Sequence, residues 1–143
     1  MDDFARARAL FVDGVAHFEA GRFDDAERCF GASLLLLPGR ASTRINLAAT
    51  RLAMGSPAAA LSELESVLAE EPQHLDAWCH RAAALAALDR DADALACADH
   101  VLAHDPEQRN AWYQRATALE RLRRFDVARP AFERLLALEP HHA

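Results

Sequence analysis

The sequence contains no lysine, and all 16 of its basic residues are arginine. Together with the abundant alanine, this is typical of a GC-rich bacterial genome and indicates no particular chemistry. Cysteine is also scarce: Cys29, Cys79 and Cys97 are an odd number at irregular spacing. This excludes a disulfide framework and favours reduced thiols in a cytoplasmic protein.

Long apolar runs are missing as well. No segment approaches the roughly 20 consecutive apolar residues that a membrane-spanning helix requires. The first ten residues carry Asp2, Asp3, Arg6 and Arg8 instead of the apolar core of a secretion signal. We therefore expect a soluble protein of the bacterial cytoplasm that has no membrane partner.

Glycine is rare, and its placement argues against catalysis. None of the five glycines belongs to a phosphate-binding G-x-x-x-x-G-K or G-x-G-x-x-G pattern, and no serine stands in a G-x-S-x-G pattern. The carboxylates Glu63, Glu65, Glu70 and Glu71 fall on a helix face that we expect to be solvated. We predict a protein that is not an enzyme and needs no cofactor.

Charge is unevenly distributed along the chain. Residues 1–108 hold 9 arginines and 18 acidic residues, while residues 109–143 hold 7 arginines and 4 acidic residues, for a total net charge of −6. Because nucleic acids require a dense basic surface, the acidic body argues against a nucleic-acid partner.

What the sequence does contain is a repeat of constant length. Prolines recur every 34 residues at Pro38, Pro72, Pro106 and Pro140. A fixed period of this length indicates stacked structural units, which are stable only against their neighbours. The register predicts four repeats without insertions, at residues 7–40, 41–74, 75–108 and 109–142.

Small residues recur at fixed places within these repeats. Their positions in the first and second helix of each repeat are Gly14, Ala48, Ala82 and Ala116, and Ala26, Ala60, Ala94 and Ala128. Small side chains at these places allow paired helices to cross closely. The turns between the helices contain Gly21, Gly55, Asp89 and Arg123, and Asp24 and Asp126 are expected to cap the second helices of the outer repeats.

This pattern resembles the tetratricopeptide repeat (TPR) family, whose signature has Trp, Leu-Gly and Tyr in the first helix and Ala, Phe and Pro in the second. Trp78 and Trp112 occupy the Trp place, and Ala-x-x-x-Phe is intact at 26–30 and 128–132, whereas Leu10 and Arg44 replace the Trp. The resemblance implies an all-α, right-handed superhelical solenoid that forms a single domain over residues 1–143.

The resemblance also implies that a protein or peptide segment binds in the concave groove, which is lined by the first helices. The residues that project there are Phe11, Val15 and Phe18, then Ser42, Ile45, Asn46, Ala49 and Leu52, then Asp76, Cys79, His80 and Ala83, and finally Asn110, Tyr113, Gln114 and Thr117. Such a groove is apolar at its N-terminal end and polar at the other. It suits an amphipathic helix or an extended segment with a few apolar anchors.

Two readings of the apolar end stay open. Phe11, Phe18 and Ile45 either anchor a partner or fill space between the repeats. If they anchor a partner, an acidic substitution at Phe18 or Ile45 should abolish partner binding and leave the helical content intact.

Two more specific sites are disfavoured. One branch of the family grips C-terminal carboxylates with lysine, asparagine and arginine; Asn46 matches that clamp, but Phe11, Val15 and Asp76 do not. The stripe Asp93, Cys97, His100 and His104 suggests a metal ion, but Cys97 and His104 lie roughly 10 Å apart along a helix, too far for one ion. We predict no metal site.

The C-terminal end of the array leaves apolar residues without a following repeat. Phe125, Leu136 and Leu138 would be covered by a second copy in a homodimer, by a partner protein, or by the rest of a longer polypeptide. The sequence thus predicts a non-catalytic scaffold or adaptor that binds a protein segment. The alternatives are a bacterial secretion-type chaperone that holds a client protein, and a regulatory module of a larger protein or enzyme.

Overall fold

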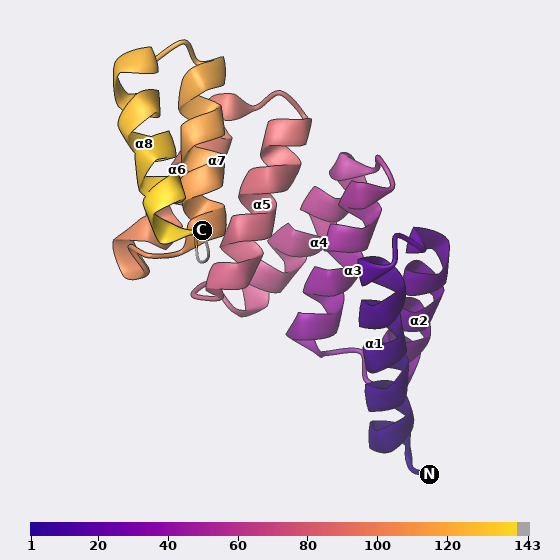
Figure 1. Cartoon of the computed structure of the whole chain (residues 1–143). Coiled ribbons are helices and arrows are strands. Elements are labelled where there is room, and N and C mark those ends of the chain that lie inside the picture. Colours follow the sequence, from indigo (N-terminus) through magenta and orange to yellow (C-terminus); the bar gives the residue numbers. More distant parts are fainter. Residues whose placement is uncertain (140–143) are drawn as a thin grey trace. The chain divides into compact units, whose positions relative to one another are not determined.

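The computed structural model describes residues 1–139, which form eight α-helices and no strand (Figure 1). The helices are α1 (Asp3–Glu19), α2 (Phe23–Leu36), α3 (Ala41–Ala53), α4 (Pro57–Glu70), α5 (Leu75–Ala87), α6 (Asp91–His104), α7 (Arg109–Arg121) and α8 (Phe125–Leu138). The predicted all-α fold of paired helices is confirmed. Pro140 and the predicted end of the fourth repeat at residue 142 lie outside the described residues.

Helix boundaries follow the 34-residue period closely. The first helices of repeats two to four start at residues 41, 75 and 109, and the second helices start at 23, 57, 91 and 125. α1 is the exception because it begins four residues before the predicted repeat. The carboxylate of Asp2 caps this extension by accepting a hydrogen bond of 2.8 Å from the amide of Ala5.

The chain divides into two compact units, residues 1–72 and residues 73–143, each with two of the predicted repeats. In the first unit α1 packs on α2, α2 on α3 and α3 on α4, and α1 also touches α3. In the second unit α5 packs on α6, α6 on α7 and α7 on α8, and α5 also touches α7. The single domain expected from the sequence stays a prediction.

The recurring small residues lie where paired helices cross. Gly14, Ala48, Ala82 and Ala116 in the first helices, and Ala26, Ala60, Ala94 and Ala128 in the second helices, are all buried. At Gly14 a Cβ atom would lie 2.6 Å from Cε1 of the buried Phe30 ring. All eight positions are thus buried, as a close crossing requires, and at Gly14 there is no room for a larger side chain.

Each turn between paired helices contains one residue in the left-handed region of backbone space. These residues are Gly21 (φ 77°), Gly55 (φ 83°), Asp89 (φ 60°) and Arg123 (φ 62°). The prediction that Asp24 and Asp126 cap the second helices is wrong, because α2 and α8 begin one residue earlier, at Phe23 and Phe125. Both aspartates instead lie in the first turn, where a negative charge interacts favourably with the helix dipole.

Arg44, which stands at the Trp place of the second repeat, joins α3 to α4 through polar contacts. Its guanidinium donates to Glu63 at 2.8 Å, to Glu70 at 2.9 Å and to Ser66 at 2.7 Å. The hydrogen bond to Glu63 is the main cause that raises the pKa of Arg44. Glu63 and Glu70 are therefore not merely solvated, as the sequence suggested; they hold a helix pair together where an aromatic ring is missing.

None of the helices within residues 1–139 combines the length and the apolar character that crossing a membrane requires.

Two glycine substitutions test the close crossing. We expect Gly14→Ala to lower the free energy of unfolding by about 1–3 kcal/mol, because its methyl group would overlap the Phe30 ring. Gly31→Ala, in the interior of α2 with no atom within 4 Å of the new methyl group, should raise it by about 0.5–1 kcal/mol through helix propensity. Urea denaturation followed by circular dichroism measures both, and equal effects of the two substitutions would contradict the crossing geometry.

Candidate functional site

A shallow hollow lies between the first helices of the second unit. Cys79, His80 and Ala83 of α5 and Asn110 and Gln114 of α7 line it, and its volume is about 130 Å³. All five belong to the set that the sequence assigned to the groove. The structure therefore brings these five predicted residues together, whereas the predicted Asp76, Tyr113 and Thr117 do not line the hollow.

The hollow offers hydrogen-bonding groups from one imidazole and two side-chain amides. His80 Nδ1 lies 2.8 Å from the carbonyl oxygen of Asp76, and because a carbonyl only accepts, Nδ1 carries the proton. In the neutral ring this leaves Nε2 as an acceptor. The side-chain amides of Asn110 and Gln114 each add donors and an acceptor. Such a set matches the alternating N–H and C=O groups of a polypeptide backbone.

An aromatic side chain and an acidic one lie on the same two helices. Tyr113, on α7 between Asn110 and Gln114, is 52% exposed, and Asp76 on α5 is exposed as well. Thr117, one turn further along α7, donates its hydroxyl to the carbonyl of Tyr113 at 2.8 Å and so is used within its own helix. Tyr113 thus provides a large, partly apolar contact surface close to the polar hollow.

The predicted apolar end of the groove, in the first unit, is used largely for packing. Phe11, Val15 and Phe18 are partly buried and pack against a core cluster of Ala26, Phe30 and Leu47. Ring centroids lie 5.9 Å apart for Phe11 and Phe30, and 5.3 Å apart for Phe18 and Phe23.

The other predicted residues of this unit lie on α3. Ile45 is only 3% exposed and belongs to the core. Asn46, Ala49 and Leu52 are partly exposed, and Ser42 is exposed. Whether a partner uses these side chains stays a prediction, but Ile45 offers almost no surface for it.

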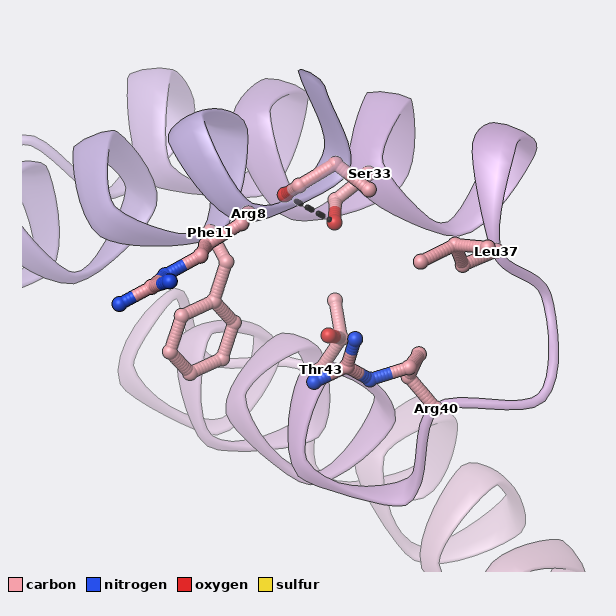
Figure 2. Close-up of a pocket in the computed structure, with 7 residues that line it drawn as sticks. Arg8, Phe11, Ser33, Leu37, Arg40 and Thr43 are labelled. Atoms are coloured by element: carbon pink, nitrogen blue, oxygen red, sulfur yellow. Dashed lines mark hydrogen bonds between the residues drawn. The ribbon is translucent and has the colours of Figure 1, made fainter. Parts of the chain in front are cut away.

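Sequence reasoning missed a second, smaller hollow, where α1, α2 and α3 of the first unit meet (Figure 2). Arg8, Ser33, Arg40 and Thr43 line it together with Phe11, the one of these five that was predicted. A comparison across the repeats could have indicated it, since later repeats have Val67, Val101 and Leu135 at the position of Ser33, and Ala77 and Ala111 at that of Thr43.

The histidine and cysteine stripe of α6 makes contacts within the protein. Cys97 accepts a hydrogen bond of 3.0 Å from Arg81, and His104 Nδ1 donates to the carbonyl of His100 at 2.9 Å. The rings of Trp78 and His100 lie at a tilt of 32° with centroids 4.1 Å apart. Burial, with a smaller effect of His104, lowers the pKa of His100. In residues 1–139 no three His, Cys, Asp or Glu side chains come together as metal ligands.

Burial also raises the pKa of the thiol in the hollow of the second unit. Cys79 is 6% exposed, and desolvation, with smaller contributions from Asp76 and Asp105, raises its pKa to about 11. A thiol with so high a pKa is a poor nucleophile at neutral pH. Cys79 therefore contributes a buried, protonated thiol to the lining of the hollow.

At the last helix, Phe125 is 55% exposed and Leu136 is 60% exposed, while Leu138 is partly buried. The expectation that Phe125 and Leu136 face outward is confirmed for these two side chains. Pairing with a second copy through them stays a prediction.

Comparisons with known proteins agree on one family. The family model described as tetratricopeptide repeat matches residues 51–122, which is half of the chain, and a second model of the same description matches residues 109–142. A curated human relative, FK506-binding protein-like, is 39% identical over 91 residues, which cover 58% of this chain and 26% of the relative. The mouse counterpart is 38% identical over 95 residues, which cover 61% of this chain and 27% of that protein. The chain thus spans about a quarter of the length of the curated relatives it matches.

Solved structures show the same fold. A thermophilic TPR protein of Thermus thermophilus superposes with a TM-score of 0.88 at 24% identity and covers 93% of this chain and 74% of its own. The first TPR of Spaghetti (RPAP3), bound to the HSP90 peptide SRMEEVD, superposes with a TM-score of 0.75 at 23% identity. The match covers 82% of this chain and 94% of the RPAP3 chain. The arrangement of helices is therefore that of a tetratricopeptide repeat array.

Burial changes the expectation for Ile45→Asp. A carboxylate at this core position has no partner, so we expect the substitution to lower the free energy of unfolding by more than about 3 kcal/mol and to reduce helical content. Asn46→Asp adds the same group at the adjacent, partly exposed position and should leave the helical content unchanged. Far-ultraviolet circular dichroism compares the two. A fully helical Ile45→Asp variant would show that this position is not core.

Cysteine reactivity tests the burial of the hollow's floor. At pH 8 only about one Cys79 side chain in a thousand is a thiolate, as its pKa of about 11 dictates. We expect iodoacetamide to label the partly exposed Cys29 at least about tenfold faster than Cys79, and all three cysteines to react alike in denaturant. Mass spectrometry of tryptic peptides measures the rates, and equal labelling in the folded protein would refute this burial.

Proposed function

The chain belongs to the tetratricopeptide repeat family, generally a non-catalytic protein-interaction fold, and we propose that it binds a segment of a partner protein on the first-helix face of its repeats. It acts as a scaffold: the stacked helices present the binding residues rigidly, so that little conformational entropy is lost on binding. Its location in the bacterial cytoplasm is part of the same proposal.

The observation that carries this proposal is the hollow lined by His80, Asn110 and Gln114. Its acceptor and amide groups suit the main chain of an extended peptide, which presents donors and acceptors in alternation. The hollow is small and shallow, so it takes up one or two residues of the segment. The exposed ring of Tyr113 then packs on a neighbouring apolar side chain, whose burial contributes roughly 1.5–3 kcal/mol.

The charge of the site supports a partner without an acidic end. The structural neighbour RPAP3 is bound to the HSP90 peptide SRMEEVD, which carries acidic residues near its C-terminus. Here no arginine lines the hollow, and the exposed carboxylate of Asp76 lies on the same helix as His80. An acidic tail would be repelled, whereas a neutral or basic segment is accommodated.

The two alternatives from the sequence, a secretion-type chaperone and a regulatory module of a larger protein, would use the same binding surface. A secretion-type chaperone would use the same surface to hold an unfolded client. A module of a longer polypeptide would use it to recruit a partner, and this second setting is supported by curated relatives in which the matching region is about a quarter of the protein. Binding of a segment by the first helices is common to all three.

A peptide selection tests the proposal. The full chain is immobilised, 12-residue peptides are selected from a random phage-displayed library, and the dissociation constants of the enriched peptides are measured by fluorescence polarisation. The double substitution Asn110→Ala/Gln114→Ala should weaken binding at least about tenfold, because two hydrogen bonds of about 1 kcal/mol each are lost. Gln73→Ala removes an exposed amide that does not line the hollow and should have no effect.

Two results would contradict the proposal. One is an unchanged affinity of the selected peptides for the Asn110→Ala/Gln114→Ala variant. The other is a selection that enriches only acidic peptides.

A further inference from the structure

One side of α1 is an apolar surface that the proposed segment binding does not use. Phe4 and Val12 are more than half exposed on it. They line a shallow depression of about 400 Å³ together with Ala5, Arg8, Ala9 and Asp13, all residues of α1. We call this surface the α1 face.

The repeat shows what covers the same side of a first helix elsewhere in the fold. Ala9 and Ala16 are exposed on α1, but the residues one and three periods further along are buried. Those equivalents are Thr43 and Thr50 on α3, and Ala111 and Ala118 on α7. The preceding second helix packs there, since α2 contacts α3 and α6 contacts α7. The α1 face is therefore a surface on which this fold seats a second helix.

α8 carries the complementary surface, which we call the α8 face. On α6, Val101 is buried against Ala111 of α7, and Leu102 packs on the same cluster. The equivalents of Val101 and Leu102 on α8 are Leu135, which is partly exposed, and Leu136, which is mostly exposed. The side of α8 that corresponds to the α7-contacting side of α6 thus keeps apolar surface.

The helices that bear the two faces differ in the sign of their charge. Residues 1–19 hold four acidic residues and two arginines. Residues 121–138 hold five arginines and two acidic residues. Surfaces of opposite charge attract each other, so the α8 face is electrostatically suited to the α1 face.

The position of one ion pair makes this match specific. Where α6 packs on α7, Arg121 of α7 pairs with Asp89, in the turn before α6. The equivalent of Arg121 in the first repeat is Glu19, and the equivalent of Asp89 in the fourth repeat is Arg123. The same pair is therefore available between an α1 face and an α8 face, with its two charges exchanged.

The second ion pair of the α6–α7 contact is replaced differently. Arg115 binds Asp99 at 2.8 Å, whereas their equivalents Asp13 and Glu133 are both acidic. Glu133 lies 3.1 Å from Arg129 on its own helix. Arg129 thus places a cation next to Glu133, where it offsets the charge of Asp13.

We propose that the α8 face of one copy of this chain binds the α1 face of a second copy, in the arrangement that α6 and α7 adopt within one chain. Ala9 of the second copy then packs on Leu135, as Ala111 packs on Val101, and Glu19 pairs with Arg123. Because the two faces differ, the contact is heterologous and leaves one face of each kind uncovered. Copies therefore associate into rings or open chains and not into a two-fold dimer.

Sedimentation velocity of the full 143-residue chain tests the association. We expect the average mass to rise with protein concentration over about a hundredfold range and to exceed that of a dimer. High salt should weaken the association, because it screens the opposite charges of the two faces.

Two variants block one face each. Ala9→Glu places a long acidic side chain on the α1 face, and Leu136→Glu does so on the α8 face. Both positions are exposed and glutamate is a good helix former, so helical content should not change. Each variant alone should remain monomeric. An equimolar mixture should form a heterodimer and nothing larger, since it retains one intact face of each kind.

Two further comparisons serve as controls. Leu35→Glu, at an exposed position of α2 outside both faces, should associate like the parent chain. Glu19→Arg and Arg123→Glu should each weaken association at least about threefold, and the double variant should restore it, because the ion pair is then present with its charges reversed.

The proposal is overturned if the parent chain is monomeric at every concentration, or if the mixture of Ala9→Glu and Leu136→Glu forms no heterodimer. It is also overturned if Ala9→Glu alone still dimerises, which would indicate a symmetric contact between two α8 faces. None of these results depends on whether the chain binds a peptide segment.

Discussion

The close crossing of the two helices in each pair is the contact on which the rest of the structure depends. Gly14 of α1 meets the Phe30 ring of α2, and Ala116 of α7 belongs to the same core cluster as Ala128 of α8. Because the backbones approach so closely, each pair has a fixed geometry, and consecutive pairs within a unit can repeat it. A larger side chain at the crossing would separate the helices and open the apolar core to water.

Polar contacts link each helix pair to the next one within a unit. In the second unit Arg115 of α7 binds Asp99 of α6 at 2.8 Å, and Arg121 binds Asp89 in the preceding turn. In the first unit Arg51 of α3 lies 3.4 Å from Glu27 of α2. Exposed ion pairs of this kind contribute up to about 1 kcal/mol each to stability. Their contribution to the fold is therefore small beside that of the packed helix crossings. α5 and α7 lie against each other, and the hollow is lined by residues of both helices.

Much of the fold was predictable because it repeats. Helix positions, the buried small residues and the left-handed turn residues follow from the 34-residue period, since each repeat confirms the register of the others. The site was predictable in its polar half: His80, Asn110 and Gln114 were assigned to one face by helical spacing and do line one hollow. The apolar half was less predictable. Helical spacing identifies the face on which a side chain lies, but it does not say whether a neighbouring helix covers that side chain. Ile45 lies on the expected face and is nevertheless buried.

The sequence alone determined the repeat length, the helix pairs and the positions where small residues are required, since these depend on local spacing and side-chain size. Only the tertiary structure decided which side chains keep exposed surface, because that depends on how closely separate helices pack on one another. Ser33 and Thr43 illustrate the difference: ten residues of sequence separate them, and nothing in their local pattern places them around one hollow. They come to face each other because α2 packs on α3.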